Sequence, residues 1–282
     1  MQKLNNEEEI KLKKIAVQIR KNVLRMIKAG GSGHIGGALS CTDIMTVLYF
    51  KILRIDPQNP TWPQRDRFVL SAGHKCLALY GTLAERGFFD SSILDTYGEL
   101  CTKLGGHPDM HKLPGVESNT GALGHGLSIA GGMAMGLKMD RLDSKVYVIL
   151  GDGELAEGSN WEAAAAASHH QLDNLVAFVD RNKFQHGGRT VDFMSYEPLD
   201  KRWEAFGWSV RVIDGNDLQQ ICENATDTPF EKGKPSMLIA DTIKSKGLPF
   251  AEDKASFHYW KVTDEEMEAA EHALQQIEEG IR

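Results

Sequence analysis

The stretch Val146-Tyr147-Val148-Ile149-Leu150-Gly151-Asp152-Gly153 decides the fold class of this chain. Its apolar run has the length of a buried strand and ends in a turn rich in oxygen donors. A second apolar run, Leu175 to Val179, is followed by Asn182-Lys183-Phe184 after an intervening helical segment. Two such strands with a helix between them are typical of a βαβ unit. Ligands of open parallel sheets bind at the carboxyl ends of the strands, so we expect both turns to face a ligand.

The two turns carry donors for a hard metal ion. Asp152 offers a carboxylate and Asn182 an amide oxygen, which suit Mg²⁺ or Ca²⁺ better than a soft metal. Mg²⁺ usually takes one or two protein groups and completes its shell with waters and the phosphates of a ligand. A Gly-Asp-Gly alone is also common as an ordinary turn, but the Asn at the end of the next strand makes the pair specific. The sequence therefore predicts a metal-bridged diphosphate.

This pattern resembles the thiamine diphosphate fingerprint of the thiamine-dependent enzymes. The detailed likeness is to transketolase, specifically to its N-terminal, diphosphate-binding half. Further segments similar to that family occur in the same order along the chain: Ser32-Gly33-His34, Arg67 to His74, Gly106-His107-Pro108, Thr120-Gly121-Ala122-Leu123-Gly124, Asp241 to Gly247, and His258. The chain departs from the family pattern at Ile35 and Ala122, where transketolases usually have Pro.

The resemblance implies a set of cofactor and metal ligands. The metal, Mg²⁺ or Ca²⁺, would be held by Asp152, the Asn182 side chain and the Phe184 carbonyl. Residues that would contact thiamine diphosphate are His74, Gly121, Ala122, Leu123, Gly153, Glu157, Asn182 and His258. Glycine beside a phosphate lets the backbone approach closely, which is the role expected of Gly153.

Histidines are the expected proton carriers, because a neutral imidazole both donates and accepts and titrates near working pH. By resemblance, His34 and His258 would handle protons near the ketose hydroxyls, and His107 would hydrogen-bond the substrate. The remaining histidines of the central region are expected to be structural or exposed: His111, His125, His169, His170 and His186. His107 and His111 are four apart, as in a zinc pair, but Pro108 disfavours a helix there and no third ligand is evident.

The resemblance covers only one part of a transketolase. The glutamate that contacts the pyrimidine ring belongs to a domain that this sequence does not contain. We therefore expect one subunit of a two-chain enzyme, inactive alone, with a C-terminal subunit that supplies the pyrimidine-binding and C-terminal domains in an α2β2 heterotetramer. The implied reaction moves a two-carbon ketol unit from a ketose (phosphate) to an aldose (phosphate), by default in the pentose phosphate pathway, although a branched or sulfonated sugar is an open alternative.

Two other functions are compatible with the residues. One is a different two-chain thiamine enzyme, such as the α-type subunit of a 2-oxo acid dehydrogenase or a deoxyxylulose phosphate synthase. The histidines at 34, 74 and 107 favour transketolase over both. The other is a non-catalytic subunit that regulates its partner, which the retention of all the clamp residues disfavours.

The composition of the chain excludes several classes of function and location. The chain has 282 residues, is 41% hydrophobic and carries a formal net charge of -7, so a nucleic-acid surface is not expected. No apolar run approaches a membrane span, and no signal peptide is expected. The cysteines lack C-x-x-C spacing, which indicates free thiols and a cytoplasmic location.

Periodicity predicts a single diphosphate-binding domain over residues 1–282, an α/β fold of three layers with helices on both faces of a mostly parallel sheet. The expected strands cover 68–71, 146–150, 175–180, 208–213 and 237–241. The expected helices cover 7–29, 41–53, 75–86, 121–139, 158–171, 199–206, 216–226 and 263–281.

Overall fold

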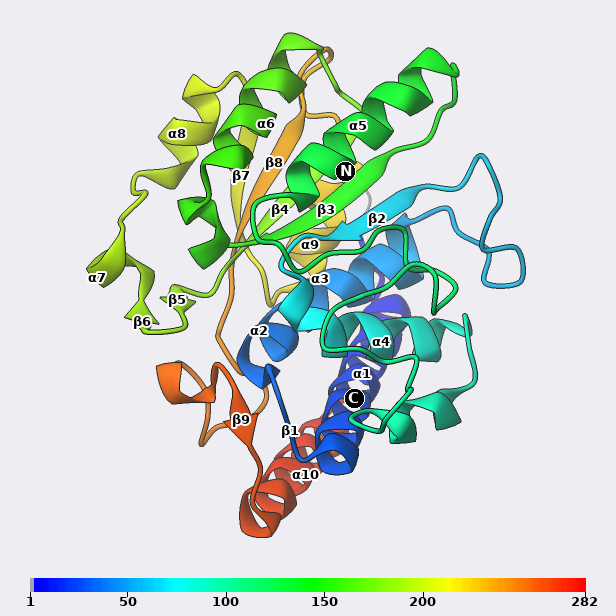
Figure 1. Cartoon of the computed structure of the whole chain (residues 1–282), viewed down its shortest axis with the longest axis vertical. Helices are drawn as coiled ribbons and strands as arrows, with labels where there is room; N and C mark the ends of the chain where they lie inside the picture. The colour runs from blue at the N-terminus through cyan, green and yellow to red at the C-terminus, as the bar shows by residue number, and fades with distance from the viewer. Residues whose placement is uncertain (1–2) are drawn as a thin grey trace.

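A five-stranded, entirely parallel sheet forms the centre of the computed structural model, which describes residues 3–282 (Figure 1). Across the sheet the strands follow the order β2 (Arg67–Leu70), β3 (Val146–Gly151), β4 (Leu175–Arg181), β8 (Ser236–Asp241) and β7 (Ser209–Asp214). All the predicted strands are present, and their ends differ from the prediction by no more than a residue or so. The apolar runs form interior strands because both faces of a parallel sheet are covered.

Alternate side chains of each strand enter two separate hydrophobic cores. Ile149 and Phe178 pack on one face of the sheet, whereas Val148 and Val179 pack on the other. The first core includes residues of α1 (Asn6–Gly30), α2 (Ile35–Ser40), α3 (Thr42–Val47), α4 (Cys76–Arg86) and α9 (Leu218–Thr226). The second includes residues of α5 (Gly126–Met139), α6 (Gly158–His169) and α8 (Leu199–Ala205).

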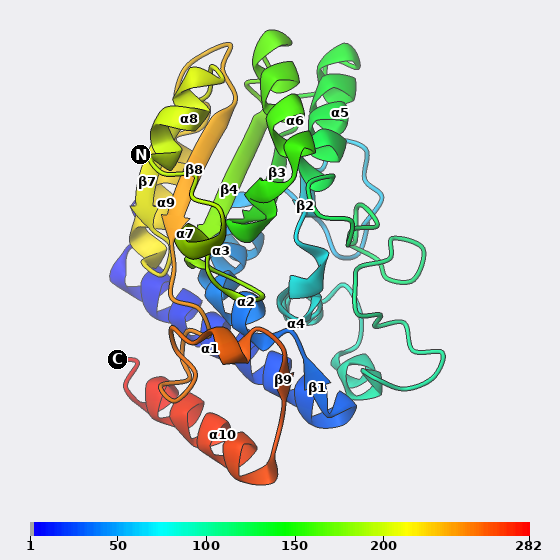
Figure 2. The ribbon, with the colours of Figure 1, turned by 60° about the vertical axis from the view of Figure 1, so that its left-hand side comes forward.

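Figure 2 shows these two groups of helices on opposite sides of the sheet, which confirms the predicted three-layer α/β fold. The C-terminal helix α10 (Asp264–Glu279) packs beside α1 in the outer part of the first layer. Both helices begin with a capping box, at Asn5 with Glu8 and at Thr263 with Glu266, so each start is set by its local sequence. No helix within residues 3–282 is long and apolar enough to cross a membrane.

Two helix predictions differ from the structure, and one helix was not predicted. The helix expected over 121–139 begins only at Gly126, because the preceding residues form a turn and include Gly121 with a φ of 142° and Gly124 with a φ of 81°. The helix expected over 41–53 ends at Val47 and continues as a π-helical turn, Leu48–Ile52. Helix α2 was not predicted, since two glycines in its six residues weaken the apolar period.

Two small antiparallel pairings carry residues toward the carboxyl edge of the main sheet. Strand β1 (Ser32–Gly33) pairs with β9 (Trp260–Lys261), which places His34 beside the segment that contains His258. Strand β5 (Phe184–Gln185) pairs with β6 (Gly188–Arg189) in a hairpin that follows β4. The hairpin leads into the one-turn helix α7 (Thr190–Phe193).

Candidate functional site

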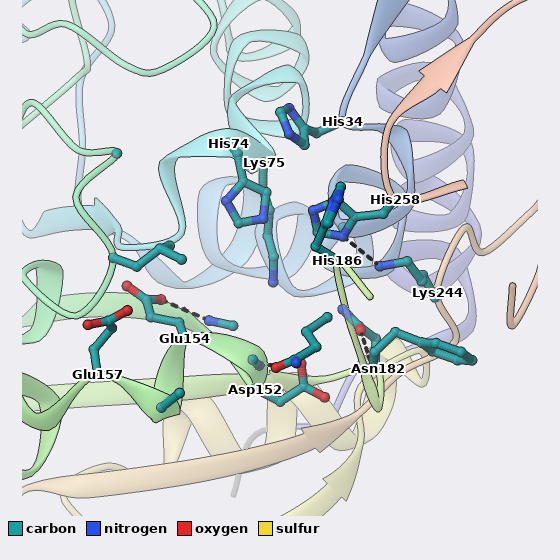
Figure 3. Close-up of a pocket in the computed structure, with 18 of the residues that line it drawn as sticks. His34, His74, Lys75, Asp152, Glu154, Glu157, Asn182, His186, Lys244 and His258 are labelled. Atoms are coloured by element: carbon teal, nitrogen blue, oxygen red, sulfur yellow. Dashed lines mark hydrogen bonds between the residues drawn. The ribbon is translucent and has the colours of Figure 1, made fainter. Parts of the chain in front are cut away.

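A cavity of about 530 Å³ lies at the carboxyl edge of the sheet, where the turns after β2, β3, β4 and β8 meet (Figure 3). It is lined by nearly all of the predicted site residues: His34, His74, His107, Gly121, Leu123, Asp152, Gly153, Glu157, Asn182, Phe184 and His258. Ala122 does not line the cavity, although its two neighbours do. The parallel register explains the gathering, because Gly151 of β3 lies opposite Asp180 of β4 and thus brings the two turns together.

Asp152 and Asn182 form the predicted metal corner of this cavity. Both are buried, at 5% and 2% exposed. The Asp152 carboxylate accepts the Gly153 N–H at 2.8 Å and the Lys183 N–H at 2.5 Å, and Asn182 Oδ1 accepts the Phe184 N–H at 3.1 Å. These bonds fix the direction of both oxygens and leave each with further lone pairs.

The electrostatics of the metal corner favour a bound cation. Burial, and next the charge of Asp180, raise the pKa of Asp152 to about 7, against the opposing effect of Lys75. A divalent cation would offset that cost by stabilising the ionised carboxylate. Within residues 3–282 no group of three or more His, Cys, Asp or Glu side chains is arranged to hold a metal. A metal at this corner would therefore depend on amide, carbonyl, water and phosphate oxygens, which is the donor set of Mg²⁺.

Two glycines, Gly153 and Gly121, line the cavity. A Cβ at Gly153 would lie 2.9 Å from Cβ of Gln185, and a Cβ at Gly121 would lie 2.9 Å from the His107 ring. Neither position has room for a side chain, and Gly121 also has a φ of 142°. Close packing against the protein thus requires glycine at both positions, and neither glycine adds a side chain to the cavity that it lines.

A buried ion pair beneath the metal corner was not predicted from the sequence. Lys75 Nζ lies 2.6 Å from Asp180 Oδ2, and the side chains are 3% and 0% exposed. Burial alone would lower the pKa of Lys75, but the charge of Asp180 raises it. Asp180 also accepts a bond from Ser40 Oγ at 2.6 Å and one from Thr242 Oγ1. The pair links the segment after β2 to the end of β4. In the sequence, the only indication of this pair was that a lysine follows His74 directly.

Glu154 is a second residue that the sequence analysis missed. Its carboxylate accepts Ser71 Oγ at 2.5 Å, the Gly124 N–H at 2.8 Å and the Gly151 N–H at 3.1 Å. Burial raises its pKa. Because its partners come from the ends of β2 and β3 and from the 120–124 loop, Glu154 fastens that loop over the cavity. Its position directly after Gly151-Asp152-Gly153 is the sequence feature from which a role at the site could have been predicted.

At the opposite end of the cavity, imidazole rings form a cluster (Figure 3). The ring centroid of His34 lies 5.2 Å from that of His74 and 5.5 Å from that of His258, and His74 and His258 are also 5.5 Å apart. Burial lowers the pKa of His74 to about 2, and burial followed by the charge of Lys244 lowers that of His258 to about 3. Burial also lowers the pKa of His34. All three rings are thus neutral near pH 7 and can both donate and accept a proton.

Lys244 contributes a cation to this end of the cavity. Its side chain is buried, and Nζ lies 3.3 Å from Nδ1 of His258. Burial, and next the charge of Lys75, lower the pKa of Lys244 to about 8. Nothing in the local sequence separates this lysine from its neighbour Lys246, because helical or strand periodicity does not report on a buried charge.

The position of His186 goes beyond what was expected from the sequence. It was expected among the structural or exposed histidines, and it is exposed, yet its ring also lines the cavity. Its centroid lies 5.3 Å from that of His258, with the two ring planes 87° apart. The other histidines placed in that group are exposed and do not line the cavity: His111, His125, His169 and His170.

Glu157 lies at the open margin of the cavity, exposed and at the start of α6. Leu123 and the exposed Ala156 also line the cavity. These residues mark where the cavity meets the surface of the described chain.

The family model and the similar known proteins point to the same family. Residues 11–277 match the family model described as transketolase, thiamine diphosphate binding domain. The chain is 45% identical over 265 residues to a 6-deoxy-6-sulfo-D-fructose transketolase subunit from Clostridium sp. (strain MSTE9), covering 94% of this chain and 96% of that relative. It is also 45% identical over 262 residues to one of the subunits of an apulose-4-phosphate transketolase from Phocaeicola vulgatus, covering 93% of this chain and 92% of that one.

Solved structures agree in fold. The transketolase of Campylobacter jejuni superposes with a TM-score of 0.88 at 32% sequence identity, covering 94% of this chain. The chain spans 42% of the length of that protein, and 40% of a Pichia stipitis transketolase with a TM-score of 0.87 and 30% identity. The cavity with its metal corner and its histidine cluster therefore lies in a chain that belongs to the transketolase family, as the thiamine diphosphate-binding domain of that family.

Proposed function

We propose that this chain is the N-terminal subunit of a two-chain transketolase that transfers a two-carbon ketol unit from a ketose (phosphate) to an aldose (phosphate). The observation that carries the proposal is the presence of a hard-donor corner and a cluster of neutral histidines in one cavity. The family match to the thiamine diphosphate-binding domain supports the cofactor. The same match favours transketolase over the other thiamine enzymes and over a regulatory subunit.

The metal corner would hold the diphosphate through Mg²⁺ or Ca²⁺. Asp152, the Asn182 side chain and the Phe184 carbonyl are the proposed metal ligands, and the bare backbone at Gly153 lets the diphosphate approach. Lys244, a buried cation on the same cavity wall, would add charge opposite the diphosphate. When bound, thiamine diphosphate supplies the electron sink for breaking and forming the carbon–carbon bond.

The histidines would handle the protons of the sugar. In the described chain the ring nitrogens of His34 and His74 have no hydrogen-bond partner, so they are free to bind a ligand in the cavity. His34 and His258 would take up and return hydroxyl protons, and His107 would hydrogen-bond the substrate. His74 and Gly121 to Leu123 would line the cofactor.

A partner chain completes the proposal. The solved transketolases are more than twice as long as this chain, whereas two relatives that match over 96% and 92% of their own length are named transketolase subunits. A C-terminal subunit would bring the pyrimidine-binding domain and its glutamate to the open margin near Glu157, in an α2β2 heterotetramer. The free cysteines fit a reducing cytoplasm.

The sugars follow from the relatives only as candidates. One relative is named for a sulfonated ketose and another for apulose 4-phosphate, so a pentose phosphate pathway role and a specialised catabolic role are both included in the proposal. The test is a two-carbon transfer assay with Mg²⁺ and thiamine diphosphate. Three ketoses would be tried as donors: xylulose 5-phosphate, 6-deoxy-6-sulfo-D-fructose and apulose 4-phosphate. The acceptor would be ribose 5-phosphate or glyceraldehyde 3-phosphate.

The assay is run on this chain alone and on the chain co-expressed with a candidate C-terminal transketolase subunit. We expect activity only in the complex. Activity of the chain alone would contradict the need for a partner glutamate. A complex that binds no thiamine diphosphate would refute the enzyme proposal and leave the regulatory alternative.

A further inference from the structure

The β5–β6 hairpin places His186 over the histidine end of the cavity. Phe184 pairs with Arg189 and Gln185 with Gly188, so His186 and Gly187 form the tip. The Thr190 N–H donates to the Lys183 carbonyl at 3.0 Å and closes the base of the hairpin. The tip has a defined direction because strands on both sides and this bond at the base restrain it.

Two contacts hold the hairpin in that position. Gln185 lies against the bare backbone of Gly153, where an added Cβ would come within 2.9 Å of it. Phe193 of α7 packs under the tip, since a Cβ at Gly187 would lie 2.6 Å from its ring. The hairpin is thus fastened to the metal corner at Gln185, and the next residue, His186, reaches the histidine cluster.

The His186 ring is available to a ligand. No described residue hydrogen-bonds its nitrogens, and the ring stands edge-to-face with His258 at 5.3 Å while it lines the cavity (Figure 3). On an ordinary exposed surface a histidine would point to bulk solvent. Here it faces His258, whose Nδ1 is already occupied by Lys244 at 3.3 Å.

We propose that His186 is a further substrate-contacting residue, which binds a hydroxyl group of the ketose donor together with His258. A ketose offers several hydroxyls in a row, and an imidazole can donate to or accept from each of them. The His186 ring lies beside that of His258, at the histidine end of the cavity (Figure 3). The inference rests on the proposed function, because it takes the substrate to be a sugar.

The test compares His186→Leu and His186→Gln in the complex with the partner subunit. Leu removes the hydrogen bond, and we expect the KM for xylulose 5-phosphate, or for the donor that the wild-type complex uses, to rise about tenfold. Gln retains a donor and an acceptor and should recover most of that loss. Thiamine diphosphate affinity, measured by calorimetric titration, should be unchanged in both variants. His272→Leu, an exposed histidine on α10, is the matched control and should change neither quantity.

Donor binding is also measured with no acceptor present, by calorimetric titration of the same ketose into the complex, so that no complete transfer contributes to the signal. An unchanged donor KM and Kd in His186→Leu would overturn the inference. A loss of thiamine diphosphate affinity as large as the rise in donor KM would also overturn it, since His186 would then only position the cofactor. A wild-type complex that binds the ketose without transfer would refute the proposed function alone, and one that binds no ketose would refute both.

Discussion

Lys75 Nζ and Asp180 Oδ2 are 2.6 Å apart in an ion pair that water hardly reaches. The two residues are far apart in sequence and come from the ends of different segments, after β2 and at the end of β4. Breaking a buried pair by removing one partner leaves the other charge without compensation. The pair therefore joins the stability of the fold to the position of Asn182, whose Nδ2 lies 3.3 Å from the same Asp180 oxygen.

We expect Lys75→Met to lower the free energy of unfolding by about 3 to 5 kcal/mol, because Asp180 remains buried and unpaired. Urea unfolding of the isolated chain measures it. The control is Lys138→Met, which breaks the more exposed pair of Lys138 with Asp173 at 2.7 Å and should cost about 1 kcal/mol or less. Equal effects of the two substitutions would contradict the structural role of the buried pair.

The metal corner should bind Mg²⁺ in a pH-dependent way. Burial raises the pKa of Asp152 to about 7, and protons compete with the metal for the same carboxylate. Apparent Mg²⁺ affinity in the presence of thiamine diphosphate should thus fall as the pH drops below 7 and level off above it. Calorimetric titration at pH 6, 7 and 8 tests this. Asp152→Ala should abolish the Mg²⁺ dependence, and a variant with unchanged cofactor affinity would refute the metal assignment.

Lys244→Met should stabilise the isolated chain while it weakens cofactor binding. Burial lowers the pKa of Lys244 to about 8, from an ordinary value near 10.5, so folding opposes the charged form. At pH 7 the wild-type chain carries that cost, and it disappears as the pH rises above 10, where the lysine is neutral in both states. We expect a gain of about 1 to 3 kcal/mol at pH 7 and little difference at pH 10.5. Urea unfolding at pH 7 and pH 10.5 measures the two free energies. An equal gain in the free energy of unfolding at both pH values would contradict the argument.

Gly153→Ala should displace the β5–β6 hairpin, because its Cβ would meet Gln185 at 2.9 Å. Overpacking of this kind typically costs about 1 to 3 kcal/mol, and here it also moves the wall of the metal corner. We expect weaker thiamine diphosphate binding in calorimetry. Gly158→Ala is the control, since a Cβ at Gly158 meets nothing within 4 Å. If the two variants bound the cofactor equally well, the close approach at Gly153 would not matter.

His34→Leu should separate binding from turnover. The ring is neutral, and its nitrogens have no hydrogen-bond partner among the described residues, which fits a proton carrier. We expect kcat of the complex to fall at least about 100-fold with thiamine diphosphate affinity unchanged. Steady-state kinetics with His170→Leu as an exposed control tests this, and normal turnover would remove His34 from the proposed catalytic residues.

The amino-acid sequence by itself determined the sheet and the place of the site. Apolar runs such as Val146 to Leu150 predict buried parallel strands because helices cover both faces of such a sheet, so that successive side chains on either face are apolar. A turn rich in oxygen donors at the end of one strand then lies next to that of its neighbour, which is why the sequence predicts that Asp152 and Asn182 lie together, as they do in the cavity. The order of the motifs further indicated the family, which the comparisons confirm.

Only the tertiary structure decided which charged and titratable side chains surround that site. Lys75, Lys244 and Glu154 are buried against partners that lie far away in the chain, and local periodicity carries no information on such pairs. His186 shows the same limit, since an exposed histidine in a glycine-containing turn has no distinctive sequence pattern. Its place beside His258 arises because β5 and β6 fold back after β4, while the pairing of β1 with β9 holds the segment that contains His258. These contacts exist only in the folded chain.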